Sequence, residues 1–154
     1  MIELVAISGD EAARMAAGAP AEQDNWARGF PREDDRDVAA VVAASGGKSG
    51  VFGSYSIVVT GQTIGTAGFY GPPDESGQVT IGYGMIEPEW GKGYGTEAVA
   101  ALIEICRRDG DVGMILADTD LDNLPSQRVL EKNGFERVRT TGASRYFELR
   151  LSQL

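Results

Sequence analysis

The sequence predicts one α/β domain, and three observations lead to this prediction. Its 154 residues fit a single domain with a proper core. Strand-like and helix-like segments follow one another along the whole length, without a linker, a repeat or a low-complexity tail. In the middle of the chain, three consecutive strand-like segments joined by turns indicate an antiparallel meander. We therefore expect one domain over residues 1–154.

The spacing of apolar residues gives the order of the elements. Alternating apolar positions predict strands at residues 2–7, 51–60, 63–70, 79–85, 112–117, 135–140 and 146–151. Apolar residues at helical spacing predict helices at residues 12–17, between residues 38 and 45, at about residues 96–109 and after residue 123.

Start and stop signals support these helices. Ser8 and Glu11 have the spacing of a capping box in front of the first helix. The acidic run at residues 34–37 precedes the second helix, where negative charge favours the positive end of the helix dipole. We interpret this run as a helix start and not as a metal site. Pro125 suits the first turn of the last helix, and Gly134 suits its left-handed end.

Composition excludes several classes of function. The formal net charge is −9, so the basic surface of a nucleic-acid-binding protein is missing. The absence of histidine removes Ser-His-Asp and Cys-His catalysis together with the commonest transition-metal ligand, and we expect chemistry without a metal. The single cysteine, Cys106, falls on an apolar helix face and is interpreted as a buried core residue.

Hydropathy gives no sign of a membrane segment. No run reaches 18 apolar residues, and the N-terminus lacks the basic and apolar regions of a signal peptide. We therefore expect a cytoplasmic protein without a membrane partner.

The most informative segment is a glycine loop between a strand and a helix. Gly91, Gly93 and Gly95 alternate there, with Lys92 between the first two. A helix that opens here directs unsatisfied N–H groups and its positive dipole end at the loop, and glycines with positive φ let the backbone approach an anion. The arrangement favours a pyrophosphate site, with a flexible turn as the alternative. Thr96 stands where a dinucleotide fingerprint needs its third glycine, so a Rossmann enzyme is not expected.

A second glycine-lysine cluster at residues 46–50 resembles the end of a Walker A loop. Val42 stands where the first glycine of that motif belongs, and a strand follows instead of a helix. We interpret the cluster as a surface turn. A nucleotide-binding module built on it is the less favoured alternative.

Two longer runs are similar to those of a known family. The run from Ile81 to Ala98 contains the glycine loop, and the run from Asp122 to Phe135 follows at the usual separation. Together they resemble the GNAT N-acetyltransferases, and more narrowly the branch that acetylates N-terminal alanines of ribosomal proteins. The resemblance covers nearly the whole chain. It implies an α/β fold with a mixed, splayed sheet and with acetyl-CoA in the V between the strand that ends near Met85 and the next strand.

The resemblance also implies the contacts with acetyl-CoA. Backbone groups of Met85 and Ile86 would hold the pantetheine arm, and Asn123 would contact the cofactor or its waters. Trp90 occupies a position where the wider family has Arg or Gln, which we interpret as a feature of the branch. The pyrophosphate would be bound by N–H groups of the loop and the helix start, which are Gly91, Lys92, Gly93, Tyr94, Gly95 and Thr96.

The implied chemistry is direct transfer of acetyl from the thioester to a neutral amine. Many family members use a tyrosine as the proton donor, at a position that Leu130 occupies here. Ser126, one turn earlier, matches a serine that this branch places near the sulfur, and it is the candidate catalytic and cofactor-binding residue. Helix capping is the alternative role for Asn123 and Ser126. Thr80 stands where related sequences often have a glutamate, so a base would come from Glu87, Asp74 or Asp24, or orientation alone would suffice.

The acceptor is expected to be a small-molecule amine or a peptide N-terminus. Its pocket would form where the loop at residues 18–35 and the hairpin meet the acetyl group, with Trp26, Phe30 and Tyr83 as walls or, alternatively, as core residues. The negative net charge is compatible with a cationic amine but does not locate a pocket. We expect a monomer or a homodimer. The main alternative function is an acyl-CoA-binding module without turnover, because the usual tyrosine and glutamate are missing.

Overall fold

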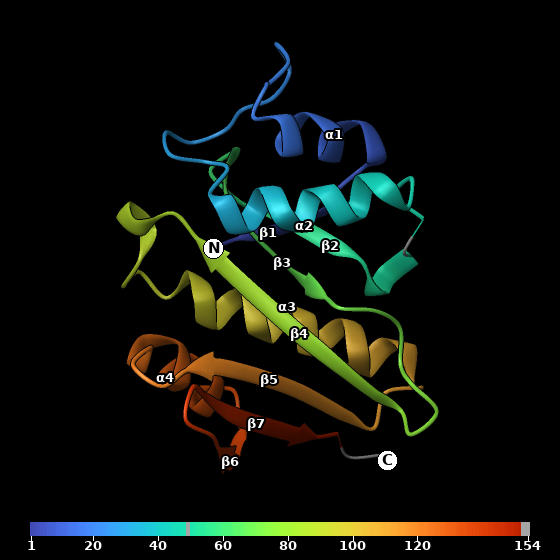
Figure 1. Ribbon diagram of the computed structural model, residues 1–154, viewed down its shortest axis with the longest axis vertical. Helices are drawn as coiled ribbons and strands as arrows, with labels where there is room; N and C mark the ends of the chain where they lie inside the picture. The colour runs from blue at the N-terminus through green and yellow to red at the C-terminus, as the bar shows by residue number, and fades with distance from the viewer. Residues whose placement is uncertain (49, 152–154) are drawn as a thin grey trace.

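A mixed β-sheet runs through the molecule (Figure 1). The structure is a computed structural model that describes residues 1–48 and 50–151. Within these residues, seven strands lie in the order β1-β2-β3-β4-β5-β7-β6, and four α-helices pack on them. The predicted α/β fold with a mixed sheet is confirmed.

The elements follow the predicted order. The strands are β1 (Glu3–Ala6), β2 (Ser54–Val59), β3 (Gln62–Phe69), β4 (Gln78–Met85), β5 (Met114–Asp120), β6 (Glu136–Thr140) and β7 (Ser144–Arg150). The helices are α1 (Gly9–Ala17), α2 (Glu33–Ala44), α3 (Tyr94–Asp109) and α4 (Leu124–Lys132). Two short 3-10 helices precede β2 and follow β4, and they are η1 (Gly50–Phe52) and η2 (Glu87–Glu89).

The start of β2 and the turn after it were predicted wrongly. Phe52 belongs to η1 and not to the strand, because its ring turns into the core and packs edge-on against Phe69 with 5.2 Å between the ring centroids. The turn of the hairpin comes one residue earlier than predicted, because Gln62 already pairs with Val59. Ser8 caps α1 as predicted, since the N–H of Glu11 donates to the Ser8 hydroxyl at 3.1 Å, which is one of the two hydrogen bonds of a capping box.

The sheet opens between β4 and β5. These two strands run parallel, and within the described residues they pair at one end, where Gln78–Thr80 lies opposite Met114–Leu116. Both strands continue beyond this contact, β4 to Met85 and β5 to Asp120. One edge of the second half of β4 therefore lacks a partner strand among the described residues. This is the V that the family resemblance implies.

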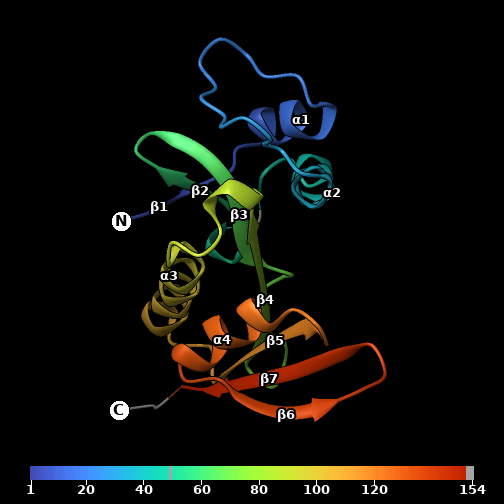
Figure 2. The ribbon, with the colours of Figure 1, turned by 90° about the vertical axis from the view of Figure 1, so that its left-hand side faces the viewer.

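Helices cover both faces of the β3–β4 pair. Figure 2 shows α2 on one side of these strands and α3 on the other. Side chains of β4 alternate between the two faces, as in any strand. Tyr83 lies against Gly95 of α3, whereas Gly84 lies under Arg32, the residue before α2. Cys106 on α3 is fully buried in the core between helix and sheet, as the sequence predicts.

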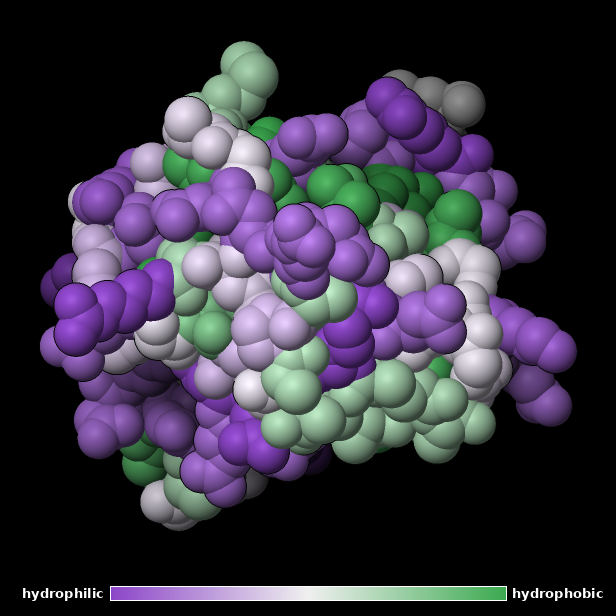
Figure 3. All heavy atoms as spheres, turned by 90° about the horizontal axis from the view of Figure 1, so that it is seen from above, coloured by the Kyte–Doolittle hydropathy of each residue, from purple (hydrophilic) through white to green (hydrophobic). Residues whose placement is uncertain are grey.

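The outer surface is largely polar where Figure 3 shows it. This view looks onto the end of the molecule that carries α1 and the loop after it, and hydrophilic residues cover most of that end, with hydrophobic residues between them. In the part of the chain that the structure describes, no helix has both the length and the hydropathy that crossing a bilayer requires.

Candidate active site

The unpaired edge of β4 presents backbone polar groups to the opening of the sheet. The N–H of Ile86 donates to the Ile64 carbonyl at 2.9 Å, and the N–H of Tyr70 donates to the Thr80 carbonyl at 3.0 Å. Even-numbered positions of β4 therefore bond toward β3. In an antiparallel pair, these positions alternate with residues whose N–H and C=O point away from the partner strand. Backbone groups that point toward the opening thus belong to Ile81, Tyr83 and Met85.

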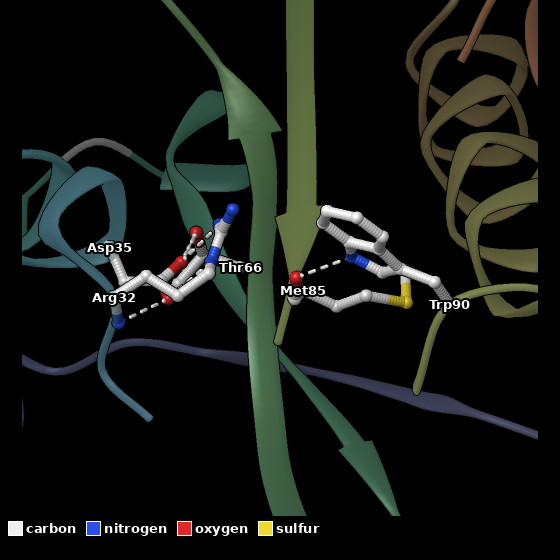
Figure 4. A network of polar contacts seen from close by, with 5 residues as sticks. All are labelled: Arg32, Asp35, Thr66, Met85 and Trp90. Carbon is white, nitrogen blue, oxygen red and sulfur yellow. Dashed lines mark hydrogen bonds and ion pairs between the residues drawn. The ribbon is translucent and has the colours of Figure 1, made fainter. Parts of the chain in front are cut away.

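Met85 and Ile86, the two residues expected to hold a pantetheine arm, differ in where their backbone groups point. Ile86 uses both backbone groups inside the protein, because its carbonyl also accepts from the Glu89 N–H at 3.0 Å. Met85 directs its backbone at the opening, where its carbonyl accepts a hydrogen bond from the Trp90 indole nitrogen at 2.8 Å (Figure 4). The edge is therefore formed by Met85 and not by Ile86, and Trp90 partly occupies it.

The start of α3 adjoins this edge. Gly91 and Gly93 have φ angles of 78° and 86°, and a Cβ on either would meet no other atom within 4 Å, so the loop is open. Gly93 is the N-cap of α3 and offers no capping side chain. The Glu97 N–H donates to the Gly93 carbonyl at 3.2 Å and makes the first hydrogen bond of the helix. An anion at this helix start would accept hydrogen bonds from the N–H groups that precede this bond, those of Tyr94, Gly95 and Thr96.

Gly95 has a different role from the two loop glycines. It lacks a positive φ and is the second residue of α3. A Cβ there would lie 3.1 Å from the Tyr83 ring and 3.4 Å from Val129. The expectation of a positive φ is therefore wrong for Gly95, whose small size instead lets α3 pack closely on β4 and α4.

Lys92 supplies the positive side chain of the loop. Its ammonium lies 3.1 Å from the Glu89 carboxylate, and the two side chains are 50% and 21% exposed. A pair this exposed contributes little to stability. A phosphate group can therefore replace Glu89 as the partner of Lys92 at small cost.

The start of α4 brings Asn123 and Ser126 to the opening. The Asn123 side-chain oxygen accepts from the Ser126 N–H at 3.2 Å, so Asn123 caps the helix, as the alternative interpretation holds. The Ser126 hydroxyl lies 2.9 Å from the hydroxyl of Tyr83 on β4. Burial raises the pKa of the Tyr83 hydroxyl, and the hydrogen bond with Ser126 lowers it by a smaller amount. Tyr83 therefore stays protonated at neutral pH.

Asn133 links the two helices that border the site. Its amide nitrogen donates to the Thr96 carbonyl in the first turn of α3 at 3.3 Å and to the Val129 carbonyl at 3.0 Å. The helix start that faces the loop is thereby held against α4. Asn133 is not among the site residues predicted from sequence, because it follows α4 directly and gives no local signal of this contact.

A buried ionic network lies on the α2 side of β4 (Figure 4). Asp35 is fully buried, and its carboxylate accepts from the backbone N–H of Arg32 at 2.9 Å and from the hydroxyl of Thr66 at 2.7 Å. It also accepts two bonds from the Arg32 guanidinium, at 2.7 and 2.9 Å. A Cβ at Gly84 would lie 2.6 Å from both terminal nitrogens of Arg32, so glycine is needed there for the guanidinium to lie against the strand.

A cavity of about 760 Å³ lies on this same face of the sheet. Its walls include the carboxylates and apolar residues of α2, aromatic residues of β3 and β4, and the guanidinium of Arg32. The residues that matter for the chemistry of the cavity are Asp34, Asp37, Val38, Tyr70 and Tyr83. Among the three expected acceptor walls, Tyr83 lines this cavity.

Trp26 and Phe30 lie outside that lining. Phe30 is buried in the core at 7% exposure, and its ring meets the Trp26 ring edge-on with 5.7 Å between centroids. Trp26 also forms an isolated bridge with Thr63 of β3. These contacts agree with the alternative interpretation as core residues, and an acceptor role for the two rings stays a prediction.

Two of the three carboxylates considered as bases have other partners, and a role for the third, Glu87, stays a prediction. Asp24 forms two hydrogen bonds with the Arg14 guanidinium, at 2.7 and 2.9 Å, and this contact holds the pKa of the Asp24 carboxyl below its usual range. Asp74 accepts two backbone N–H bonds within its own turn at 2.9 Å each. Neither carboxylate is arranged as a general base at the opening.

The sequence carries a match that decides the family. A family model described as "Acetyltransferase (GNAT) domain" matches residues 2–136. The chain belongs to the GNAT acetyltransferase family. Its relatives include the uncharacterized N-acetyltransferase YjdG of Bacillus subtilis (strain 168), 40% identical over 74 residues, which are 48% of this chain and 44% of that protein. A kanamycin resistance protein of Rhizobium radiobacter is 46% identical over 50 residues, 32% of this chain and 46% of that protein. The matches thus span less than half the length of each relative.

Solved structures share the fold of this GNAT domain. A GNAT-family acetyltransferase from Streptococcus pneumoniae has a TM-score of 0.72 at 10% identity, covering 99% of this chain and 100% of that one. The aminoglycoside acetyltransferase AAC(6′)-Ib, in complex with paromomycin and acetyl-CoA, has a TM-score of 0.68 at 24% identity, covering 97% and 93%. A proposed ribosomal-protein-serine acetyltransferase from Vibrio cholerae has a TM-score of 0.69 at 18% identity, covering 97% of this chain and 94% of that one. The GNAT resemblance is thereby confirmed, and the neighbours at these identities show the shared fold.

Proposed function

We propose that this GNAT domain transfers acetyl from acetyl-CoA directly to a primary amine of a small molecule or of a peptide N-terminus. The observation that carries the proposal is the open edge of β4 beside the uncapped start of α3. A strand edge binds an extended polar arm through main-chain hydrogen bonds, and a helix start binds phosphate. Because Gly95 in the first turn of α3 lies against the Tyr83 ring of β4, one elongated ligand that carries both groups can use both features.

These two features also give the ligand a direction. With the pyrophosphate at residues 91–96, the arm would run along β4 from Met85 toward Tyr83. Its far end would then lie deep in the V, toward the point where β4 and β5 pair at Thr80. A thioester at that end is enclosed by two strands, which limits its loss to water.

The amine would enter from the cavity on the α2 face. Asp34 and Asp37 contribute negative charge to its walls, and Tyr70 contributes an aromatic ring. Carboxylates and aromatic faces together favour a cationic amine. Two cationic residues, Arg32 and Lys48, belong to the same walls; Asp35 balances the charge of Arg32, and Lys48 offsets part of the charge of the two carboxylates. The paromomycin bound to AAC(6′)-Ib is an amine-bearing small molecule, which supports this acceptor class.

The test combines binding with turnover. Titration of the purified chain with acetyl-CoA in a calorimeter measures donor binding. Release of free CoA thiol, followed with a thiol reagent, is then measured against amines, amino acids, aminoglycosides and N-terminal peptides. We expect donor binding and amine-dependent release with at least one class. Donor binding without release across the whole panel would instead support the acyl-CoA-binding module.

A nucleotide-binding module has its own test. Of the cluster at residues 46–50, Ser49 lies outside the described residues, and the described part joins α2 to the three-residue η1. Stabilisation by ATP and magnesium but not by CoA, measured as a thermal shift, would support this alternative. We expect stabilisation by CoA.

A further inference from the structure

Two hydroxyl groups meet across the opening of the sheet. Tyr83 extends from β4 and Ser126 from the first turn of α4, a helix that packs on β5, and their oxygens lie 2.9 Å apart. The Tyr83 ring is held in this direction by Gly95 on α3, where a Cβ would come within 3.1 Å of it. The two hydroxyls therefore lie at a fixed place beside the diverging end of β4, on the face that α3 covers.

Tyr83 also borders the second region that the reaction needs. It belongs to the lining of the cavity on the α2 side, where the amine is expected to enter, while its ring and hydroxyl lie against α3 and α4. The helix position where many GNAT enzymes carry a tyrosine is occupied by Leu130, which is buried in the core at 1% exposure. If a side chain protonates the departing sulfur, it therefore lies elsewhere in the chain.

We propose that Tyr83 is the catalytic acid that protonates the departing sulfur, and that Ser126 is the residue that positions it. This inference rests on the proposed function, since it assigns a role within the same acetyl transfer. It differs from the expectation drawn from sequence, in which Ser126 is the candidate donor and Tyr83 a wall of the acceptor pocket.

In the proposed step, Tyr83 gives one proton to the sulfur and regains one from the nitrogen. The neutral amine nitrogen attacks the carbonyl carbon of the thioester, the C–N bond forms and the C–S bond breaks. The sulfur keeps the electron pair of that bond and takes the proton of the Tyr83 hydroxyl. The Tyr83 oxygen, stabilised by the Ser126 hydroxyl, recovers a proton from the cationic nitrogen of the new amide. The products are the neutral amide and CoA thiol, and Tyr83 returns to its initial form.

The surroundings of Tyr83 suit this role. Its neighbours on α3 and α4 include Gly95 and Ser126, neither of which carries a charge, and no charged group is among the causes of the shift in its pKa. Burial raises the pKa of its hydroxyl, so that the acid form is present throughout the neutral range. A serine hydroxyl is a much weaker acid than a phenol, so Ser126 serves better as hydrogen-bond partner than as proton source.

A binding experiment tests contact with the sulfur independently of turnover. The affinities of CoA and of desulfo-CoA, which lacks the sulfur, are measured by calorimetry for the wild type and for Tyr83→Phe. If the hydroxyl bonds to the sulfur, the wild type prefers CoA, and Tyr83→Phe lowers this preference about fivefold, the amount expected for one hydrogen bond. An unchanged ratio of the two affinities would overturn the proposal. Tyr146→Phe removes a hydroxyl on β7 and is the matched control with an unchanged ratio.

Turnover gives the second readout, with an amine identified by the CoA-release panel. We expect Tyr83→Phe to lower kcat by about 100-fold while KM for acetyl-CoA changes little, which is the size of effect of one positioned acid. The wild-type rate should fall at high pH as Tyr83 loses its proton, and this fall should be absent in Tyr83→Phe. Ser126→Ala, which leaves the ring in place, should lower kcat by a smaller factor. An active Tyr83→Phe enzyme that keeps the wild-type fall at high pH would overturn the proposal.

The two proposals fail in different ways. If no amine releases CoA but the preference for CoA over desulfo-CoA depends on Tyr83, the proposed function fails and the contact with sulfur stands. If amines release CoA and neither readout responds to Tyr83→Phe, the proposed function stands and the role of Tyr83 is overturned. Thermal unfolding of each variant shows whether a loss of activity comes from a loss of folding.

Discussion

Two ion pairs, one at the start of α2 and one just before α3, differ in almost every physical respect, and Figure 4 shows the first of them. Arg32 and Asp35 on the α2 side approach to 2.7 Å, with side chains 27% and 0% exposed. Lys92 and Glu89 in the glycine loop approach to 3.1 Å, with side chains 50% and 21% exposed. Both are pairs three residues apart in sequence, so the difference comes from burial and not from local spacing.

Burial determines what each pair can do. An exposed pair is solvated and screened by salt, so either member can exchange its partner for a ligand. A buried carboxylate with further hydrogen bonds, such as Asp35, cannot do so, because removing its partner leaves it charged and unsolvated. We therefore interpret Arg32 and Asp35 as the rigid wall of the acceptor side, and Lys92 and Glu89 as the exchangeable part of the donor side.

The largest expected effect is on the buried pair. Asp35→Ala leaves Arg32 without its carboxylate and Thr66 without its acceptor, and we expect a loss of about 3–5 kcal/mol in the free energy of unfolding. Urea denaturation followed by circular dichroism measures it. Glu104→Ala breaks an exposed pair with Arg108 on α3, where the side chains are 53% and 79% exposed, and should change stability by less than about 0.5 kcal/mol. Similar losses in the two variants would contradict the contrast.

The second effect is on donor affinity and not on stability. Lys92→Glu places a second negative side chain beside Glu89, and we expect acetyl-CoA affinity to fall about tenfold, since its phosphates are repelled. Glu89→Gln is the matched variant of opposite sign, because it releases Lys92 for the phosphates, and its affinity should rise a few-fold. Calorimetry at low and at physiological salt measures both, with smaller differences at higher salt. Equal affinities in all three proteins would show that the loop does not bind the phosphates.

The strand, loop and helix of the proposed donor side could be predicted from sequence because their signals are local. The glycine loop, the preceding strand and the following helix lie within one continuous run, and their spacing alone indicates an anion site. The Asn123 cap is local in the same way. What could not be predicted are contacts between distant residues. Tyr83 and Ser126 are 43 positions apart, and Asn133 and Thr96 are 37 apart, so their meeting depends on how α4 packs against α3 and β4.

The walls of the proposed acceptor pocket were harder to predict from sequence, for a related reason. Aromatic residues serve equally as pocket walls and as core, and sequence does not separate the two uses. Trp26 and Phe30 pack on each other, whereas Tyr83 lines the cavity. The acidic run at residues 34–37 starts a helix, as predicted. One member, Asp35, turns inward to Arg32, and two others, Asp34 and Asp37, line the cavity, because successive helical residues face different directions.

The smallest expected effect concerns Trp90, which sharpens the description of the donor side. Its indole N–H occupies the Met85 carbonyl on the open edge of β4, the same edge along which the pantetheine arm is expected to lie. The side chain belongs to a residue that is 61% exposed, so little packing holds it there. If the arm bonds to that carbonyl, it competes with the indole. Trp90→Phe keeps an aromatic ring, removes the N–H and should raise acetyl-CoA affinity about two- to fivefold, in keeping with one net hydrogen bond of about 1 kcal/mol. Calorimetry measures the change. Weaker binding would mean that the indole helps to hold the cofactor, so that Trp90 would belong with the fixed parts of the site and not with the exchangeable ones.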